Sequence, residues 1–541
     1  MEKDFLLLIK KDEIKTISGF KNVNNKFYEV LSGYIFISKN KFDEFFYNKN
    51  FNDIIGEFVY IKYNILKKEI EILLDKLGRY PIYLFKNKEY IGLSNNYWKL
   101  ISELKKFNIK FSINREFLYE TILYGTNFFN NTHIFEIKKL IYGSYLKIDL
   151  EKSKINEMKY WDFKLNSQVK DIDEASKLIE YSIIETLEKA KKEDKTYGIG
   201  VSGGLDSRIL LYYAKKLGFK IHPFIISKKR PNFLFLAKDI KAAKNVCKNF
   251  NENLEIYDPF KYDFFKRLKE EIKNNPVSPS NADTYVLEKF NFDYLLTGAN
   301  GYIIGGGVFP ENLLYIDKEN FLKNFMFFIY PKSFNTLKRI FRYTKKNFKH
   351  HEQLNIEYEL KKVHYELYEK IVNYTYSVVQ KSQNLVEANL KLYHQAFGQH
   401  NFNGVFESIS GQYTSYSIYT TYLLNYLDKF SPEHIVERNA LKNLLKKLPK
   451  NIYKTEGQSP HSSLNINILD TLDYLIRGYG VRNREYDFKR YFKKFKNYKF
   501  ETSEILGYKN LRNSSRLFHD FVKHNIICMK ILEKNDWRDL L

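Results

Sequence analysis

The stretch YGIGVSGGLDSR, residues 197–208, decides the fold of the region around it. A short β-type run, YGIGVS, leads into Gly203 and Gly204, and the helical pattern RILLYYAKKLG starts almost at once. Glycines let a backbone approach an anion closely, and the amides at a helix start favour negative charge. Asp206, beside such an anion, suits a Mg²⁺ ion that bridges phosphate oxygens. No GK[ST] follows, so the pattern is not of the Walker type; it predicts a site for a nucleotide pyrophosphate.

Strand and helix patterns alternate on both sides of this stretch. Residues 172–192 have apolar side chains at helical spacing, and KIHPFIIS (220–227) is followed by the helical pattern DIKAAKNVCKNF (239–250). FDYLLTG (292–298) then leads into a glycine-rich loop. This alternation predicts a parallel sheet with helices on both faces and a ligand at the carboxyl ends of its strands.

The N-terminal part has a different pattern. Residues 1–165 contain short β-type runs between polar turns, and one helix is expected at FLYETILYG (117–125). The expected strands are FLLLIK, YIFISK, EFVYIKYN, EIEILLD and YIGLSN. From about residue 315 the chain is rich in aromatic residues, and its pattern is mostly helical to the end. We therefore expect a β-rich domain, a parallel-sheet domain and a helical C-terminal region.

Composition limits the class of protein. A chain of 541 residues is long enough for two to four domains, and its two cysteines, Cys247 and Cys528, indicate neither a disulfide framework nor a zinc site. The N-terminal segment does not have the pattern of a signal peptide, and no apolar run approaches the ~20 residues that span a bilayer. We expect a cytoplasmic protein with no membrane partner.

The chain is strongly basic, with 88 basic and 64 acidic residues and a net charge of +24. An anionic partner such as RNA is one explanation, and residues 477–500 do interleave basic residues with Tyr and Phe. An overuse of Lys, Asn, Ile, Tyr and Phe along the whole chain is the alternative. We favour compositional bias, so a nucleic-acid partner is open but not favoured.

Several motifs together resemble those of the asparagine synthetase family, over most of residues 50–460. DKLGRYPIY (75–83) resembles RDxxGxxPLYY, and FEIKKLIYGSYL (135–146) resembles FxGIxxLxPGxxL. Tyr160 and Trp161 resemble the YW pair that joins the two domains of that family, and SGGLDS (202–207) matches its loop fully. DIKAA (239–243) resembles the DLKAA stretch that follows the second strand.

The resemblance implies an α/β protein with three parts. A glutaminase-like, Ntn-hydrolase-like α+β sandwich domain would span residues 1–165. A parallel-sheet domain of the adenine-nucleotide alpha-hydrolase kind would span 170–465, and a helical extension would span 466–541. Carried over by position, the ATP-binding residues are Val201, Ser202, Gly203, Gly204, Leu205, Ser207, Ile226 and Gly298. Asp206 would ligate Mg²⁺, and Val201 and Ile226 would flank adenine.

The sequence departs from the family at four positions. Glutamine-hydrolysing members expose Cys as residue 2, whereas this chain has Glu2, so we expect no glutaminase activity. Beta-lactam synthetase and lasso-peptide cyclase resemble this arrangement. The acids of two further family motifs fall at Tyr302 and Tyr413, and Glu456 stands where the catalytic lysine is expected. Lys454, two residues earlier, is our candidate for reaching the phosphates, with a solvated surface lysine as the alternative.

These observations favour an ATP-dependent, amide-forming ligase of the asparagine synthetase type. It would adenylate a carboxylate, release pyrophosphate and pass the acyl group to ammonia or an amine, without using glutamine. The alternatives are a catalytically impaired ATP-binding scaffold and an RNA-modifying enzyme with the same loop. The identity of the acceptor and the oligomeric state, a homodimer included, stay open.

Overall fold

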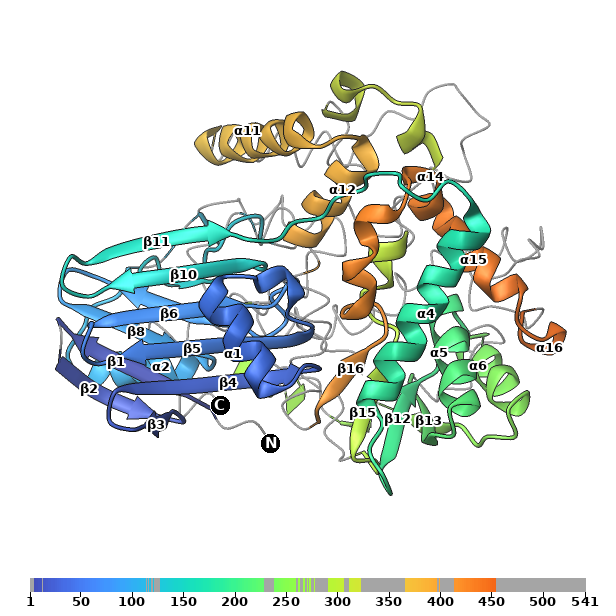
Figure 1. Ribbon diagram of the computed structural model, residues 1–541, viewed down its shortest axis with the longest axis horizontal. Helices are drawn as coiled ribbons and strands as arrows, with labels where there is room; N and C mark the ends of the chain where they lie inside the picture. Colours follow the sequence, from blue (N-terminus) through green and yellow to red (C-terminus); the bar gives the residue numbers. More distant parts are fainter. Residues whose placement is uncertain are drawn as a thin grey trace, which may run out of the picture.

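The computed structural model covers the whole chain. It describes residues 4–11, 13–112, 114, 116–117, 120, 127–227, 238–258, 261–262, 266–267, 270, 272–273, 277, 290–305, 311–322, 365–396, 398 and 413–453. Two antiparallel sheets come first along the chain, and a parallel sheet with its helices follows (Figure 1). The mixed α/β class expected from the sequence is thus confirmed, whereas the exact domain boundaries stay predictions.

The two antiparallel sheets form a sandwich. One has the strand order β2-β1-β8-β7-β9 and the other β11-β10-β6-β5-β4-β3. The strands of the first sheet are β1 (Leu6–Lys10), β2 (Glu13–Ser18), β7 (Tyr83–Lys86), β8 (Tyr90–Ser94) and β9 (Ile137–Lys139). Those of the second are β3 (Lys21–Val23), β4 (Phe27–Ile35), β5 (Gly56–Asn64), β6 (Glu69–Leu74), β10 (Ser144–Asp149) and β11 (Lys154–Lys159).

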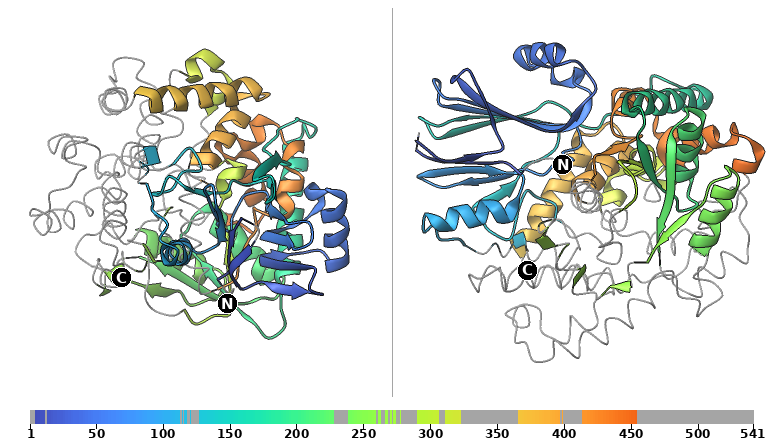
Figure 2. Two further views of the ribbon diagram at one scale, coloured as in Figure 1. Left: turned by 90° about the vertical axis from the view of Figure 1, so that its left-hand side faces the viewer. Right: turned by 90° about the horizontal axis from the view of Figure 1, so that it is seen from below.

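Alternation along the strands builds the core of the sandwich. Leu7 and Ile9 of β1 are buried in one cluster with Ile61 of β5 and Ile72 of β6, because every second side chain faces the opposite sheet. Helix α1 (Lys39–Asn48) packs on the outer face of the second sheet through Phe42 and other aromatic side chains. Helix α2 (Tyr97–Lys106) covers the first sheet, so the sandwich lies between two helices (Figure 2).

The third sheet is parallel throughout, with the order β14-β13-β12-β15-β16. Its strands are β12 (Thr196–Gly200), β13 (Lys220–Ile226), β14 (Glu255–Tyr257), β15 (Tyr294–Thr297) and β16 (Ser415–Ser417). Helices α4 (Ile172–Ala190), α5 (Leu205–Lys216) and α6 (Lys238–Lys248) contribute to the core on one face. On the other face the described residues form an aromatic cluster around Phe224, Phe292 and Tyr413.

The remaining described helices lie beside these layers. They are α11 (Tyr365–Lys381), α12 (Leu385–Tyr393), α14 (Pro432–Ile435), α15 (Asn439–Lys446) and α16 (Lys450–Tyr453), together with short 3-10 turns that include η4 (Gly301–Ile304). Helix α15 packs against α4, while α11 and α12 approach the sandwich near β11 (Figure 1). Among the described helices, none combines the length and the apolar character that crossing a bilayer requires.

Most of the expected elements are present. The structure confirms the helix expected at 172–192, which is α4, and helix α6. It also confirms the strands expected at YGIGVS, KIHPFIIS and FDYLLTG, which are β12, β13 and β15. The expectation of a strand at YIFISK (34–39) is only partly right, because β4 ends at Ile35 and Ser38 caps α1. Helices α1 and α2 and strand β16 are among the elements that the sequence pattern did not predict. Most of the expected helix at 117–125 lies outside the described residues, as does the region after residue 453.

A buried polar network joins the sandwich to the parallel sheet. Arg79 pairs with Glu57 at 2.7 Å inside the sandwich and donates a hydrogen bond to Ser415 of β16, also at 2.7 Å. Thr420 hydrogen-bonds to the same Glu57, and Lys76 donates to Asn425. The DKLGRYPIY segment of the sequence analysis therefore lies at the contact between the two parts of the molecule.

Candidate functional site

The candidate site lies where the strand order of the parallel sheet reverses. From β12 the chain builds outward through β13 to β14 and then returns to place β15 on the other side of β12. In open parallel sheets, ligands bind in the crevice at the carboxyl ends of the strands beside such a switch point. The loop after β12 (201–204) and the loop after β15 (298–301) flank this position. The sequence analysis predicted ligand residues in both loops.

Gly203 gives the first loop its shape. Its φ of +74° is a left-handed conformation that favours glycine, and a Cβ here would lie 2.6 Å from the Cβ of Ala242 in α6. The resemblance to DLKAA therefore has a structural reason, because small residues of α6 let the loop approach. Gly203 is required both for the turn and for this close packing.

The first turn of α5 offers unpaired amides. Gly204 is the N-cap residue and provides no side-chain cap, while the first intrahelical bond is accepted by its carbonyl from the amide of Arg208. Within the described residues, no hydrogen bond occupies the amides of Leu205, Asp206 and Ser207. Such amides, together with the positive end of the helix dipole, are suited to bind a phosphate.

The two serines of the motif stabilise the loop. The Ser207 hydroxyl donates to the Gly204 carbonyl at 3.2 Å and accepts from the amide of Ser202 at 3.4 Å. The Ser202 hydroxyl accepts from the amide of Gly204 at 3.3 Å. Both hydroxyls thus hold the turn in place, and their predicted contact with phosphate stays a prediction.

Glycines of the second loop allow close approach to Asp206. A Cβ on Gly298 would lie 2.9 Å from the Cβ of Asp206, and one on Gly301 would lie 2.8 Å from its Oδ1. The loop after β15 is therefore packed directly against the carboxylate of α5. The contact of Gly298 with Asp206 places it beside the SGGLDS loop, and its predicted role in closing a nucleotide cleft stays a prediction.

Arg438 is a member of the site that the sequence analysis missed. Its Nη1 lies 2.9 Å from Oδ2 of Asp206, and its Nε donates to the carbonyl of Gly305 at 3.2 Å. About one fifth of each side chain of this ion pair is exposed. Glu437 and Arg438 both have positive φ, 53° and 60°, an arrangement that directs the guanidinium toward α5. The sequence gives little signal for this, because neither residue type favours that conformation.

Tyr302 occupies the position after Gly298 where the family resemblance places a metal-binding acid, and Asn300 is a nearby residue with a neutral side-chain oxygen. Asn300 is 1% exposed, and neither polar atom of its side chain has a hydrogen-bond partner among the described residues. Tyr302 is buried, and its hydroxyl makes a 2.5 Å hydrogen bond with Nδ1 of His394. Tyr302 therefore has a structural partner, whereas the side-chain oxygen of Asn300, one residue before Gly301, has none among the described residues.

The other predicted residues have mixed positions. Val201 is only 1% exposed and belongs to the core, whereas Ile226 at the end of β13 is half-buried. Tyr413 packs in the aromatic cluster and donates to the carbonyl of Phe290 at 2.9 Å. Of the two residues expected to flank adenine, only Ile226 has an exposed part of its side chain that could contact a base.

Lys454 and Glu456 lie outside the described residues, as do Glu2, Cys528 and the basic–aromatic segment 477–500. The main chain just before Lys454 is described, however. Arg208 of α5 is fully buried and donates through Nη1 to the carbonyls of Ile452 and Tyr453, each at 3.4 Å. Burial lowers the pKa of this guanidinium to about 10. The chain therefore reaches α5 directly before Lys454.

A Mg²⁺ ion fits this donor set with one protein carboxylate. Oδ2 of Asp206 faces Arg438, whereas the buried Oδ1 makes no regular hydrogen bond to a described residue. The fully buried hydroxyl of Tyr419 interacts with the same carboxylate, which, after burial, helps to raise the pKa of Tyr419. Magnesium beside a polyphosphate commonly takes one or two carboxylate oxygens and completes its octahedron with phosphate and water. The described part of the chain contains no cluster of three or more His, Cys, Asp or Glu that could hold a metal without such a ligand.

Comparisons with known proteins add little to this geometry. No protein-family model and no characterised protein matched the chain. Among solved structures, a glutamine phosphoribosylpyrophosphate amidotransferase from B. subtilis, complexed with ADP and GMP, is 10% identical with a TM-score of 0.16. That match covers 40% of this chain and 50% of the other, so this chain spans about half of that protein.

A second structure, described as the allosteric regulatory enzyme of purine biosynthesis, is 8% identical with a TM-score of 0.17. It covers 50% of this chain and 66% of the other. Likeness at this level supports no inference about activity.

Proposed function

We propose that the chain is an ATP-dependent, amide-forming ligase of the asparagine synthetase type. A substrate carboxylate would attack the α-phosphorus of ATP, giving an acyl-adenylate and pyrophosphate. Ammonia or an amine would then attack the acyl carbon, so that the amide forms and AMP leaves. Because Glu2 replaces the nucleophile, we propose that glutamine is not the nitrogen donor.

One observation carries this proposal. Three amides at the start of α5 have no hydrogen-bond partner in the described part of the chain. They follow Gly203 and lie at the switch point of a parallel sheet, beside the Asp206–Arg438 pair. Negative charge develops on the departing pyrophosphate, and preorganised amides with a guanidinium stabilise it without reorganising. Asn300, buried without a hydrogen-bond partner among the described residues, is an independent indication that a polar ligand completes the site.

Within this proposal each described residue has a separate task. Leu205, Asp206 and Ser207 offer main-chain amides to phosphate oxygens, and Arg438 supplies positive charge. Oδ1 of Asp206 and the side-chain oxygen of Asn300 would hold Mg²⁺. When bound, this ion would neutralise charge on the phosphates. We propose that Lys454, which follows the chain anchored by Arg208, extends toward the same phosphates.

Pyrophosphate release tests the proposal directly. Purified protein with MgATP is screened against carboxylates together with ammonia or amines, and pyrophosphate and AMP are measured. We expect release that depends on one acceptor and one amine, and a loss of at least about 100-fold in the variant Asp206→Asn. Glu188→Gln, an exposed acid on α4, is the matched control and should leave turnover unchanged. Full turnover in Asp206→Asn would exclude the proposed metal role.

An ATP-binding protein without turnover is the second candidate. The ion pair with Arg438 favours it, because the guanidinium occupies one of the two carboxylate oxygens that a metal could use. Calorimetry separates the two candidates. ATP binding without pyrophosphate release from any acceptor supports the second, and the absence of both rules out both.

A further inference from the structure

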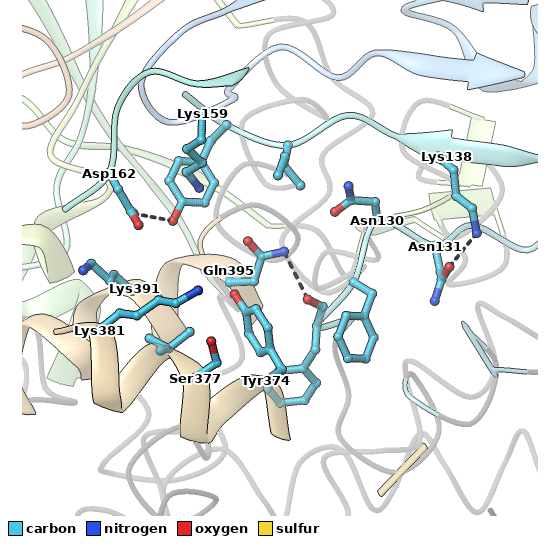
Figure 3. A pocket seen from close by; sticks show the side chains of 15 residues that line it. Asn130, Asn131, Lys138, Lys159, Asp162, Tyr374, Ser377, Lys381, Lys391 and Gln395 are labelled. Carbon is cyan, nitrogen blue, oxygen red and sulfur yellow. Dashed lines mark hydrogen bonds between the residues drawn. The ribbon is translucent and has the colours of Figure 1, made fainter. Parts of the chain in front are cut away.

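A basic pocket lies between the sandwich and helices α11 and α12, apart from the glycine loop (Figure 3). Its volume is about 550 Å³, which is within the usual range for small-molecule sites. Its walls come from three regions: residues 128–142, the end of β11 with Asp162, and the two helices. All lining residues belong to the described part of the chain.

Four lysines line this pocket against a single acid. They are Lys138, Lys159, Lys381 and Lys391, and the acid is Asp162. In Figure 3, Lys381 and Lys391 lie along one side, with Lys159 above them and Lys138 across the cavity. Like charges gathered in one cavity repel one another, and a bound anion would relieve this repulsion.

The lysines are only partly compensated by protein groups. Lys391 pairs with Glu387 at 2.6 Å, and Lys138 donates to Asn131 at 2.8 Å. Lys159 has its Nζ 3.3 Å from the centre of the Tyr142 ring, and no ion pair joins Lys159 or Lys381 to a carboxylate of a described residue. Asp162 accepts a hydrogen bond from the Tyr142 hydroxyl at 2.8 Å, so part of its charge is already engaged.

The rest of the wall can accommodate an organic body. Gln395 and Asn130 offer amide groups, and Ser377 offers a hydroxyl. The rings of Phe128, Phe129 and Tyr374 provide apolar surface for a flat or ring-shaped ligand. A cavity that combines basic and aromatic side chains selects a molecule that carries charge on an apolar frame.

We propose that this pocket binds a small organic polyanion, with at least two phosphate or carboxylate charges on a ring-shaped body. The lysines bind the charged groups, and the aromatic side chains contact the body. The inference is independent of the proposed ligase activity, because it concerns a different cavity and needs no turnover.

Lys159 makes the pocket accessible to a chemical probe. Its side chain is exposed to the water of the pocket, yet protein atoms surround it, and this dehydration lowers the pKa of its amine to about 8. At pH 7 roughly 10% of such amines are uncharged, compared with about 0.04% of an ordinary lysine. Lys159 should therefore be far more nucleophilic than a surface lysine.

Pyridoxal 5′-phosphate combines an aromatic ring, a phosphate and an aldehyde. The uncharged amine attacks the aldehyde carbon, water leaves, and borohydride then delivers hydride to the C=N bond and fixes the label. We would label the full chain at pH 7 at limiting probe and map the modified lysine by mass spectrometry. We expect Lys159 to carry the most label, and inorganic phosphate or citrate to protect it.

Variants distinguish a built site from general reactivity. Lys381→Met should lower labelling of Lys159 about 10-fold by removing a charged partner of the phosphate. Lys154→Met, at the exposed start of the same strand β11, is the control and should change nothing. Label spread evenly over surface lysines, or no protection by either anion, would overturn the proposal. Stronger protection by phosphate assigns a phosphate ester, and stronger protection by citrate assigns a polycarboxylate.

Discussion

At the scale of single residues, Gly203 has the most restricted position in the site. Its left-handed φ and its 2.6 Å approach to Ala242 are independent constraints. We expect Gly203→Ala to lower the free energy of unfolding by about 2 kcal/mol. It should also weaken ATP binding, because the amides of α5 would shift. Urea denaturation and calorimetry measure the two effects.

Gly200→Ala is the matched control, since a Cβ at Gly200 meets its nearest atom at 3.9 Å and its φ is ordinary. The double variant Gly203→Ala/Ala242→Gly should recover the part of the loss that comes from the steric contact. If Gly203→Ala were as stable as Gly200→Ala, the described loop conformation would be wrong.

Single residues also show what the sequence could predict about the site. Glycines at a strand–helix junction have a local physical reason, so Gly203 and Gly204 were predictable from the motif alone. The resemblance singled out Gly298 for the nucleotide cleft, but its close approach to Asp206 becomes visible only in the structure. Arg438 was not predictable, because it is 232 residues from Asp206 and its backbone conformation is unusual for its type. The pocket lysines were missed because they belong to separate segments that share no motif.

At the scale of elements, the site depends on how α15 is attached. Arg438 caps this helix in a left-handed conformation, and the carbonyl of Ile435 leaves no room for a Cβ on Gly305, whose φ is +88°. The segment before α15 is thereby fixed against the loop after β15. The guanidinium of Arg438 then balances the charge of Asp206 at the start of α5.

Arg438→Met tests this arrangement. The change leaves Asp206 as an uncompensated negative charge beside the proposed phosphate site, so ATP affinity should fall at least about 10-fold. Lys446→Met, an exposed change on the same helix, should leave affinity unaffected. Calorimetry at fixed Mg²⁺ gives both values. Tighter ATP binding in Arg438→Met would mean that the guanidinium blocks the metal site. That result would favour the second candidate function, an ATP-binding protein without turnover.

The elements themselves were predictable where the pattern was local. The run at 172–192 has apolar spacing and acidic residues in its first turn, and α4 follows it closely. Helix α1 was missed because its aromatic side chains, Phe42 and Phe46, follow a strand-like run directly. Strand β16 is only three residues long and pairs with β15 from more than 100 residues away, so tertiary contact decides it.

At the scale of the whole molecule, the sandwich and the parallel sheet are joined by buried polar groups. Glu57 is 1% exposed and Arg79 is 4% exposed, and Arg79 also reaches Ser415 of the far sheet. Burial works against the charge of Arg79, but the neighbouring Glu57 outweighs this effect and leaves the pKa of the guanidinium raised. A contact of this kind transmits any disturbance of one part to the other.

Removing one partner of this pair should therefore affect both parts. Arg79→Met leaves Glu57 buried without its counter-charge, and we expect a loss of about 3–5 kcal/mol in the free energy of unfolding. Lys147→Met breaks the half-exposed pair with Glu69, also 2.7 Å long, and should cost under about 1 kcal/mol. Hydrogen exchange should show reduced protection in both β5 and β16 for Arg79→Met alone. If only β5 lost protection, Arg79 would stabilise the sandwich without coupling it to the parallel sheet.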